Sequence, residues 1–164
     1  MMMSEPITYE LDALIGLSTP SATRADIVRV VRTFLGTKFH DRGRTPGLAL
    51  DCAGVLICAA RALGLVAPDF DVPDYTGVPD GKMTVWCDRY MTRIQKSTMQ
   101  PGDAIAIITD EEPQHLGILT DYRNGGLAIV HASNDTLHMR VIETRLMFSR
   151  HFRFGGAWRM PGIA

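Results

Sequence analysis

Apolar residues recur at helical spacing in the first part of the chain. Over residues 21–35 they return every three or four positions after a polar run that suits a helix start, and Gly36 ends the pattern. Residues 52–63 are apolar on nearly every face and are followed by Gly64. A helix that is apolar all round belongs in a protein interior. We therefore predict a helix over 21–35 and a buried central helix over 52–63.

Segments with glycine and proline separate the predicted helices. Residues 37–50 contain two glycines and a proline among polar residues, which predicts a loop. Residues 66–82 carry three prolines and two glycines, which favours an irregular arm at the surface or at the edge of a cleft. Residues 83–95 are predicted to form a third helix.

The hydrophobic pattern changes to a period of two after residue 103, which is typical of half-buried strands. Short runs of this kind cover residues 104–109, 115–120, 127–132, 138–143 and 152–159. Turn residues at 111–113, 123–126 and 133–135 separate the first four runs, and consecutive strands with short turns pair antiparallel. The pattern predicts an α+β fold in which helices pack on a five-stranded antiparallel sheet.

Composition indicates one globular domain. The chain has 164 residues, of which 46% are hydrophobic and 21% charged, and it contains no internal repeat or long linker. We assign residues 21–162 to the domain and residues 1–20 to an N-terminal extension. With 17 Lys and Arg against 18 Asp and Glu, the net charge of -1 argues against binding to nucleic acid. The apolar runs are far shorter than the roughly 20 residues that cross a bilayer, so no membrane insertion is expected.

The cysteines single out one candidate nucleophile. Cys52, Cys58 and Cys87 are odd in number and lack metal-type spacing, so at least one free thiol is expected. A lone cysteine is more often a packed core residue, and we interpret Cys58 and Cys87 in this way. Cys52 instead follows Asp51, the predicted cap of the buried helix. Backbone N–H groups at a helix start favour an anion, which lowers the pKa of a thiol there.

Two histidines are the candidate partners of Cys52. A thiolate nucleophile needs a base within hydrogen-bond reach and a third group that orients the base. His115 and His131 lie on consecutive predicted strands and are expected to share one sheet face, which would pack on the helix of Cys52. Gly117 is predicted to clear the approach to the imidazole of His115. Cys52, His115 and His131 are therefore the candidate catalytic residues.

A metal site is the alternative interpretation of the same three residues. They could supply three ligands to zinc, with water as the fourth. Zinc thiolates commonly come from closely spaced cysteine pairs, which this sequence lacks, so we expect no metal and no other cofactor. Inhibition by a thiol alkylator but not by a chelator would indicate a thiol nucleophile and not a zinc site.

Two further residues near Cys52 are expected to shape the cleft. We expect His40 to line it and Gly54 to let backbone or bound peptide come close.

Several short strings, in their order and spacing, resemble the NlpC-type, papain-like cysteine peptidases that cut the peptide stems of bacterial cell wall, especially the branch found in phage tails. The strings span residues 34–39, 50–54, 100–103, 114–118, 129–133 and 155–159. The resemblance covers about residues 27–162. It implies a papain-like fold with Cys52 as nucleophile, His115 as general base and His131 as the residue that orients the base.

The resemblance also identifies candidate substrate-binding positions. It implies that Asp51 caps the helix and is a candidate contact for a substrate amine. The family usually has tyrosine where Phe39 stands and serine where Ala53 stands, so both positions lack the usual hydroxyl. Loss of one oxyanion donor costs about 3 to 4 kcal/mol of transition-state stabilisation, which predicts slow turnover.

The implied activity is hydrolysis of peptidoglycan stem peptides, at a bond of the D-glutamyl-diaminopimelate type. The N-terminus lacks the features of a signal peptide, so we expect synthesis in the cytoplasm and action in the periplasm or cell wall as part of a phage or prophage tail. Leu11, Leu14 and Ile15 are predicted to pack on the domain or to bind a tail protein. The alternative is a tail-assembly or structural protein that keeps the fold with weak or no catalysis. A lipid acyltransferase or thioesterase is disfavoured, because those relatives place histidine before cysteine.

Overall fold

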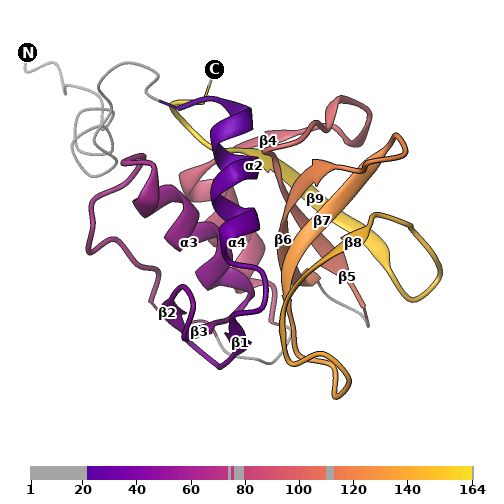
Figure 1. The fold of residues 1–164 in the computed structure, drawn as a ribbon. Coiled ribbons are helices and arrows are strands. Elements are labelled where there is room, and N and C mark those ends of the chain that lie inside the picture. Colours follow the sequence, from indigo (N-terminus) through magenta and orange to yellow (C-terminus); the bar gives the residue numbers. More distant parts are fainter. Residues whose placement is uncertain (1–21, 74, 76–79, 110–112, 164) are drawn as a thin grey trace, which may run out of the picture.

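A computed structural model describes residues 22–73, 75, 80–109 and 113–163. The helices gather on one side of the molecule and the long strands on the other (Figure 1). The helices are α2 (Arg24–Thr33), α3 (Cys52–Ala62) and α4 (Lys82–Tyr90). The N-terminal extension, with Leu11, Leu14 and Ile15, lies outside the described residues, as do residues 111 and 112 of one predicted turn. Among the described helices, none has the length and apolar character needed to cross a membrane.

The strands form one sheet, which in the described residues has the order β2-β3-β1-β8-β7-β6-β5-β9-β4. Its strands are β1 (Lys38–Phe39), β2 (Arg44–Thr45), β3 (Ala49–Leu50), β4 (Thr92–Ile94), β5 (Ala104–Ile108), β6 (Pro113–Asp121), β7 (Leu127–Ser133), β8 (Arg140–Arg145) and β9 (Arg153–Arg159). A short 3-10 helix, η1 (Lys96–Thr98), precedes β5. The five predicted strands correspond to β5–β9, and each neighbouring pair among them is antiparallel. The predicted α+β fold is confirmed.

Two stretches differ from the prediction. The third helix ends at Tyr90 instead of reaching residue 95, because Met91 adopts an extended backbone and Thr92–Ile94 pairs with β9. The stretch 37–50, predicted as a loop, contains three two-residue strands, and Lys38 pairs with both Ala49 and Arg140. Strands this short carry no readable alternation, and their pairing is decided by distant partners.

The two N-terminal helices begin at capped positions. Thr23 caps α2, and its hydroxyl accepts a hydrogen bond from Asp26 N while the Asp26 carboxylate accepts one from Thr23 N. Asp51 caps α3, and its carboxylate accepts a hydrogen bond from Gly54 N at 2.7 Å. Such caps satisfy backbone donors that have no partner within the helix. The predicted start of the second helix at Cys52 is thereby confirmed.

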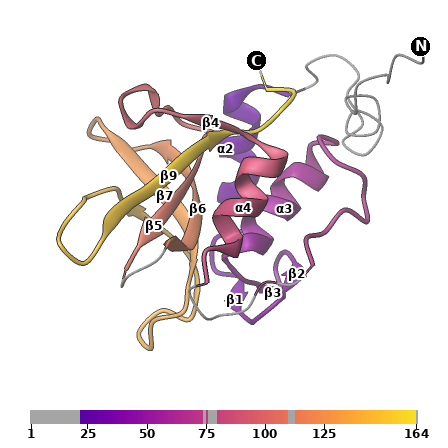
Figure 2. The same cartoon turned by 180° about the vertical axis from the view of Figure 1, so that it is seen from behind.

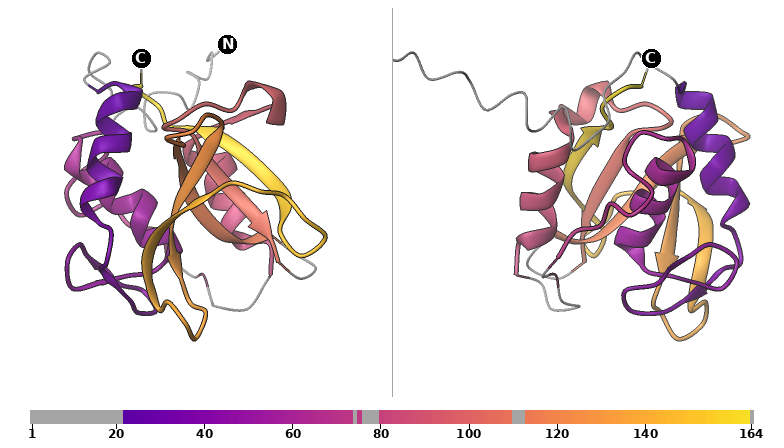
Figure 3. Two further views of the ribbon diagram at one scale, coloured as in Figure 1. Left: turned by 45° about the vertical axis from the view of Figure 1, so that its right-hand side comes forward. Right: turned by 90° about the vertical axis from the view of Figure 1, so that its left-hand side faces the viewer.

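Helix α3 lies at the centre of the main core. All residues from 53 to 60 are buried, as the apolar sequence predicted. The helix runs between α2 and α4 (Figure 3, right). Helix α4 lies beside β9 (Figure 2). The sheet residues in this core are Leu116, Ile118, Val130 and Ala132 among others. A second cluster, Ile105, Ile107, Leu119 and Ile129, forms on the opposite face of the sheet. Because α3 is packed in the core, the position of Cys52, its first residue, is fixed as well.

Candidate active site

Cys52 and the two predicted partner histidines line one cavity. The cavity has a volume of about 590 Å³ and lies where the start of α3 meets the ends of β6 and β7. Cys52 is half-buried there, and neither it nor the other two cysteines forms a disulfide. His115 comes from β6 and His131 from β7. The fold thus brings together three side chains that are far apart in the sequence.

The two histidines are in direct contact. His115 Nε2 lies 2.6 Å from His131 Nδ1, and the two rings are perpendicular, at 88°. One of these nitrogens carries the proton that they share. On its other side, His131 Nε2 lies 3.5 Å from Thr144 Oγ1 of β8. Because Nε2 of His115 faces His131, Nδ1 is the ring nitrogen of His115 that takes no part in this contact.

The histidines lie on the opposite face of the sheet from the predicted one. We expected them on the sheet face that packs on the helix of Cys52. That face instead carries Leu116 and its apolar neighbours. Since side chains alternate along a strand, His115 shares its face with Leu119, which belongs to the second cluster. The histidines and Cys52 therefore line the cavity at the end of the strands and not across the packed face.

Burial, more than the helix start, controls the acidity of the thiol. Desolvation raises the pKa of Cys52 to about 12, and the neighbouring Asp51 carboxylate acts in the same direction. Hydrogen bonds from the backbone of Leu116, Ala53 and Cys52 itself lower the pKa but do not reverse the shift. A helix N-terminus contributes only about 0.3–1 kcal/mol, which desolvation readily exceeds. The prediction of a lowered thiol pKa is therefore wrong for this cavity.

The histidine pair is also shifted toward its neutral form. Burial lowers the pKa of His115, and the adjacent His131 lowers it further. Burial likewise lowers the pKa of His131, although the nearby Asp135 carboxylate opposes this shift. At neutral pH the site consequently holds a protonated sulfur next to a neutral imidazole pair. His115 is therefore in the unprotonated form that a general base requires.

The remaining predicted positions are placed as follows. Phe39 and Asp51 line the cavity with Cys52. His40 is exposed, its Nδ1 lies 2.8 Å from the Asp41 carbonyl oxygen, and it is not among the lining residues of the cavity. Ala53 is buried and lines a separate apolar cleft between α3 and α4.

The two predicted glycines serve the packing of the protein itself. A Cβ atom on Gly54 would lie 2.3 Å from the Gly43 carbonyl oxygen, so Gly54 lets the loop before β2 approach α3. A Cβ atom on Gly117 would lie 2.6 Å from the Ile129 side chain. Gly117 thus makes room for the second core cluster on the neighbouring strand, and its role beside the His115 ring stays a prediction.

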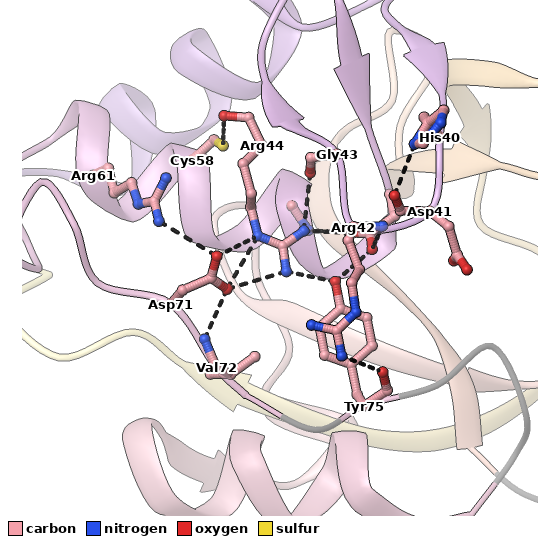
Figure 4. Close-up of polar contacts among 12 residues, drawn as sticks. His40, Asp41, Arg42, Gly43, Arg44, Cys58, Arg61, Asp71, Val72 and Tyr75 are labelled. Carbon is pink, nitrogen blue, oxygen red and sulfur yellow. Dashed lines mark hydrogen bonds and ion pairs between the residues drawn. The ribbon is translucent and has the colours of Figure 1, made fainter.

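Sequence reasoning missed a polar network around Asp51. It consists of Arg42, Arg44, Asp71 and Tyr75, drawn in Figure 4 with their neighbours. The two arginines flank Gly43 just before the Asp51–Cys52 pair, which is a sequence signal that could have drawn attention to them. Asp71 and Tyr75 lie in the irregular arm, where no periodic pattern indicates a contact.

The structure offers no evident metal centre in the part of the chain that it describes. No group of three or more His, Cys, Asp or Glu side chains there is arranged to hold a metal ion. Cys58 is buried and its Sγ donates to the Arg44 carbonyl oxygen at 3.3 Å, and Cys87 is buried on α4. Both agree with the packing role predicted for them.

Comparisons with known proteins identify the fold. No protein-family model and no curated protein matches the sequence. Among solved structures, the NlpC/p60 domain of the peptidoglycan hydrolase SagA is 20% identical with a TM-score of 0.58, and the alignment covers 85% of this chain and 100% of that domain. An NlpC/P60 family protein from Bacillus cereus ATCC 10987 is 18% identical with a TM-score of 0.62, over 87% of this chain and 42% of that one.

A third similar structure is NlpC1 from Trichomonas vaginalis, which is 19% identical with a TM-score of 0.61, over 85% of this chain and 45% of that one. The chain therefore spans less than half the length of NlpC1 and of the Bacillus cereus protein. Identities this low relate folds and not activities. With the helix start at Cys52 and the antiparallel strands β5–β9 in place, the chain has the papain-like NlpC/P60 fold.

Proposed function

We propose that this protein is a cysteine peptidase that hydrolyses amide bonds in the peptide stems of bacterial peptidoglycan. The observation that carries the proposal is the cavity in which Cys52 lies with the directly bonded pair His115 and His131. The fold supports it, because SagA, which shares this fold, is a peptidoglycan hydrolase. Fold alone does not define a reaction, so the side chains of the cavity carry the argument.

The proposed reaction begins with a proton transfer. His115 takes the thiol proton of Cys52, and the sulfur attacks the amide carbonyl carbon, whose oxygen becomes an oxyanion. The protonated His115 then donates its proton to the leaving amine, and an acyl-thioester remains on Cys52. Water, deprotonated by His115, attacks the thioester and releases a carboxylic acid and the thiol. His131 holds the His115 ring in place, and Thr144 lies behind it.

Backbone amides are the oxyanion donors available near the sulfur. The N–H groups of Cys52 and Ala53 lie at the start of α3, where unpaired backbone donors accumulate. Phe39 lines the cavity but has no hydroxyl to add. We therefore expect turnover that is slow for a site of this kind.

We further propose, from the resemblance of the sequence strings to the phage-tail branch, that the bond cut joins D-glutamate to diaminopimelate. On the same basis we propose that the protein reaches the periplasm or cell wall on a phage or prophage tail and binds tail proteins there. Mass spectrometry of purified virions tests the second part. Detection of the chain in virions is the expected result, and its absence from them argues against tail carriage.

The decisive experiment is mass spectrometry of muropeptides after incubation of purified peptidoglycan with the protein. We expect new fragments whose termini identify the cut bond. Cys52→Ala should abolish them, whereas Cys58→Ser removes a thiol elsewhere on α3 and should leave them unchanged. Fragments that persist with Cys52→Ala contradict the assignment.

A structural protein without catalysis is the second candidate. It is favoured by Phe39 and Ala53, which lack the hydroxyls usual at these positions. Under this alternative, the intact protein releases no muropeptides.

A further inference from the structure

Tyr75 contacts the start of the nucleophile helix although it belongs to the irregular arm. Its side chain is only 5% exposed. Its hydroxyl donates a hydrogen bond to Asp51 Oδ2 at 2.5 Å and accepts one from Arg44 Nη2 at 2.5 Å. Because Asp51 caps α3 and directly precedes Cys52, this side chain links the arm to the first turn of that helix.

The Asp51 carboxylate is enclosed by four donors. Oδ1 accepts from Gly54 N at 2.7 Å and from Arg44 Nη1 at 2.9 Å. Oδ2 accepts from Arg42 N at 2.9 Å and from the Tyr75 hydroxyl. Three of these donors come from residues within nine positions of Asp51, so Tyr75 is the long-range member of this set. With its oxygens occupied, Asp51 has little capacity left for a substrate amine.

Tyr75 is itself held firmly from two sides. Arg42 Nη2 donates to the Tyr75 carbonyl oxygen at 3.0 Å, and the Arg42 and Arg44 guanidinium groups lie 5.0 and 5.4 Å from the centre of its ring (Figure 4). Arg44 also donates to both oxygens of Asp71, at 3.1 Å, which ties down the arm a second time. Arg42 has a φ of 57°, a left-handed conformation that a non-glycine residue adopts only where its surroundings enforce it.

Tyr75 also connects this polar network to the catalytic cavity. Tyr75 lines the cavity that contains Cys52 and His115. It also lines the apolar cleft between α3 and α4, where Met83 is a second residue common to both spaces. Tyr75 therefore lies where the polar cavity and the apolar cleft adjoin.

We propose that Tyr75 is a positioning residue for Cys52, which acts by holding Asp51 and the start of α3 in register with the histidine pair. The hydroxyl is the part of the side chain that matters, because it alone reaches Asp51. Loss of this donor leaves more of the Asp51 charge acting on the sulfur, and it loosens the first turn of α3. Both effects disfavour the attacking thiolate.

The test is Tyr75→Phe, which removes the hydroxyl and keeps the ring between the two arginines. On a purified stem peptide we expect kcat to fall about tenfold, the effect of one lost hydrogen bond to a charged group, with KM within about twofold of the wild type. The rate of Cys52 alkylation by iodoacetamide at neutral pH should fall severalfold. Alkylation needs no substrate, so only the kcat part rests on the proposed function.

Tyr90→Phe is the matched control. Tyr90 packs on Phe70 and Trp86 at the apolar cleft and does not line the catalytic cavity. The same chemical change there should leave kcat and alkylation at wild-type values. A second variant, Arg42→Gln, removes the guanidinium from Tyr75 but keeps the Arg42 N–H on Asp51, and should shift both rates in the same direction by a smaller factor.

The outcomes separate the two claims. If Tyr75→Phe is folded and matches the wild type in kcat and in alkylation, the inference is overturned. A rise in KM with unchanged kcat and alkylation overturns it as well, since the residue then only shapes the substrate wall. If the wild type cleaves no stem peptide while Tyr75→Phe still slows alkylation, the positioning role holds and the proposed peptidase function fails.

Discussion

Replacement of His131 by alanine tests directly how much the contact between His131 and His115 contributes to catalysis. His131 is 8% exposed, and its Nδ1 lies 2.6 Å from Nε2 of His115. The variant removes this contact and leaves Nε2 of His115 without its protein partner in a buried site. A buried polar group without a partner costs about 1–3 kcal/mol, which corresponds to a loss of about 5- to 150-fold in kcat if the misplaced base acts in the transition state.

The same variant should change the pH profile. The adjacent His131 and burial both lower the pKa of His115, and the alanine variant removes the first and relieves the second. The pKa of His115 should therefore rise. Since only the neutral imidazole can take the thiol proton, the acid limb of kcat/KM must move to higher pH.

The assay is the release of an amine from a stem peptide between pH 4 and 9, with folding checked by circular dichroism. His131→Asn keeps a polar partner for His115 and should recover part of kcat. A folded His131→Ala variant with kcat within about twofold of the wild type, or with an unmoved acid limb, refutes the role of His131 as the orienting residue.

Three further predictions concern acidity and stability. Because the pKa of His115 is lowered, the wild type should retain kcat/KM as the pH falls below about 6.5, the ordinary pKa of histidine, and a loss of activity centred there contradicts this. Gly54→Ala should lower the free energy of unfolding by about 1–3 kcal/mol in urea titrations, because its Cβ would lie 2.3 Å from the Gly43 carbonyl oxygen; an unchanged midpoint contradicts that packing. Asp103 is fully buried and accepts hydrogen bonds from Arg24 and Arg159, so Asp103→Ala should cost about 2–3 kcal/mol in the same titration, and a neutral effect would show that these contacts are weak.

Several elements were predictable because their signals are local. The cap at Asp51 and the apolar run behind it define α3, and the alternation in β5–β9 defines the antiparallel strands. Three short strands were missed in residues 37–50, and β4 was mistaken for the end of a helix. β1 pairs with β8 and β4 pairs with β9, at the two edges of the five predicted strands, and a short local pattern does not indicate such distant partners.

The candidate site was likewise predictable only in part. The choice of Cys52, His115 and His131 followed from a helix start and from two neighbouring strands, and all three line one cavity. The acidity of Cys52 was predicted with the wrong sign, since desolvation depends on what covers the sulfur. Asp71 and Tyr75 were not found at all, because an arm with proline and glycine shows no periodicity that indicates which side chain turns inward.

The amino-acid sequence by itself determined the main helices, the strands β5–β9 and the choice of Cys52, His115 and His131 as candidate residues, because hydrophobic period, capping and residue type act over a few neighbouring positions. Only the tertiary structure decided that the histidines meet each other at the strand ends, that burial keeps the thiol protonated, and that Tyr75 closes the arm on Asp51. Those properties depend on solvent exclusion and on contacts between residues far apart in the chain, so they exist only once the chain has folded.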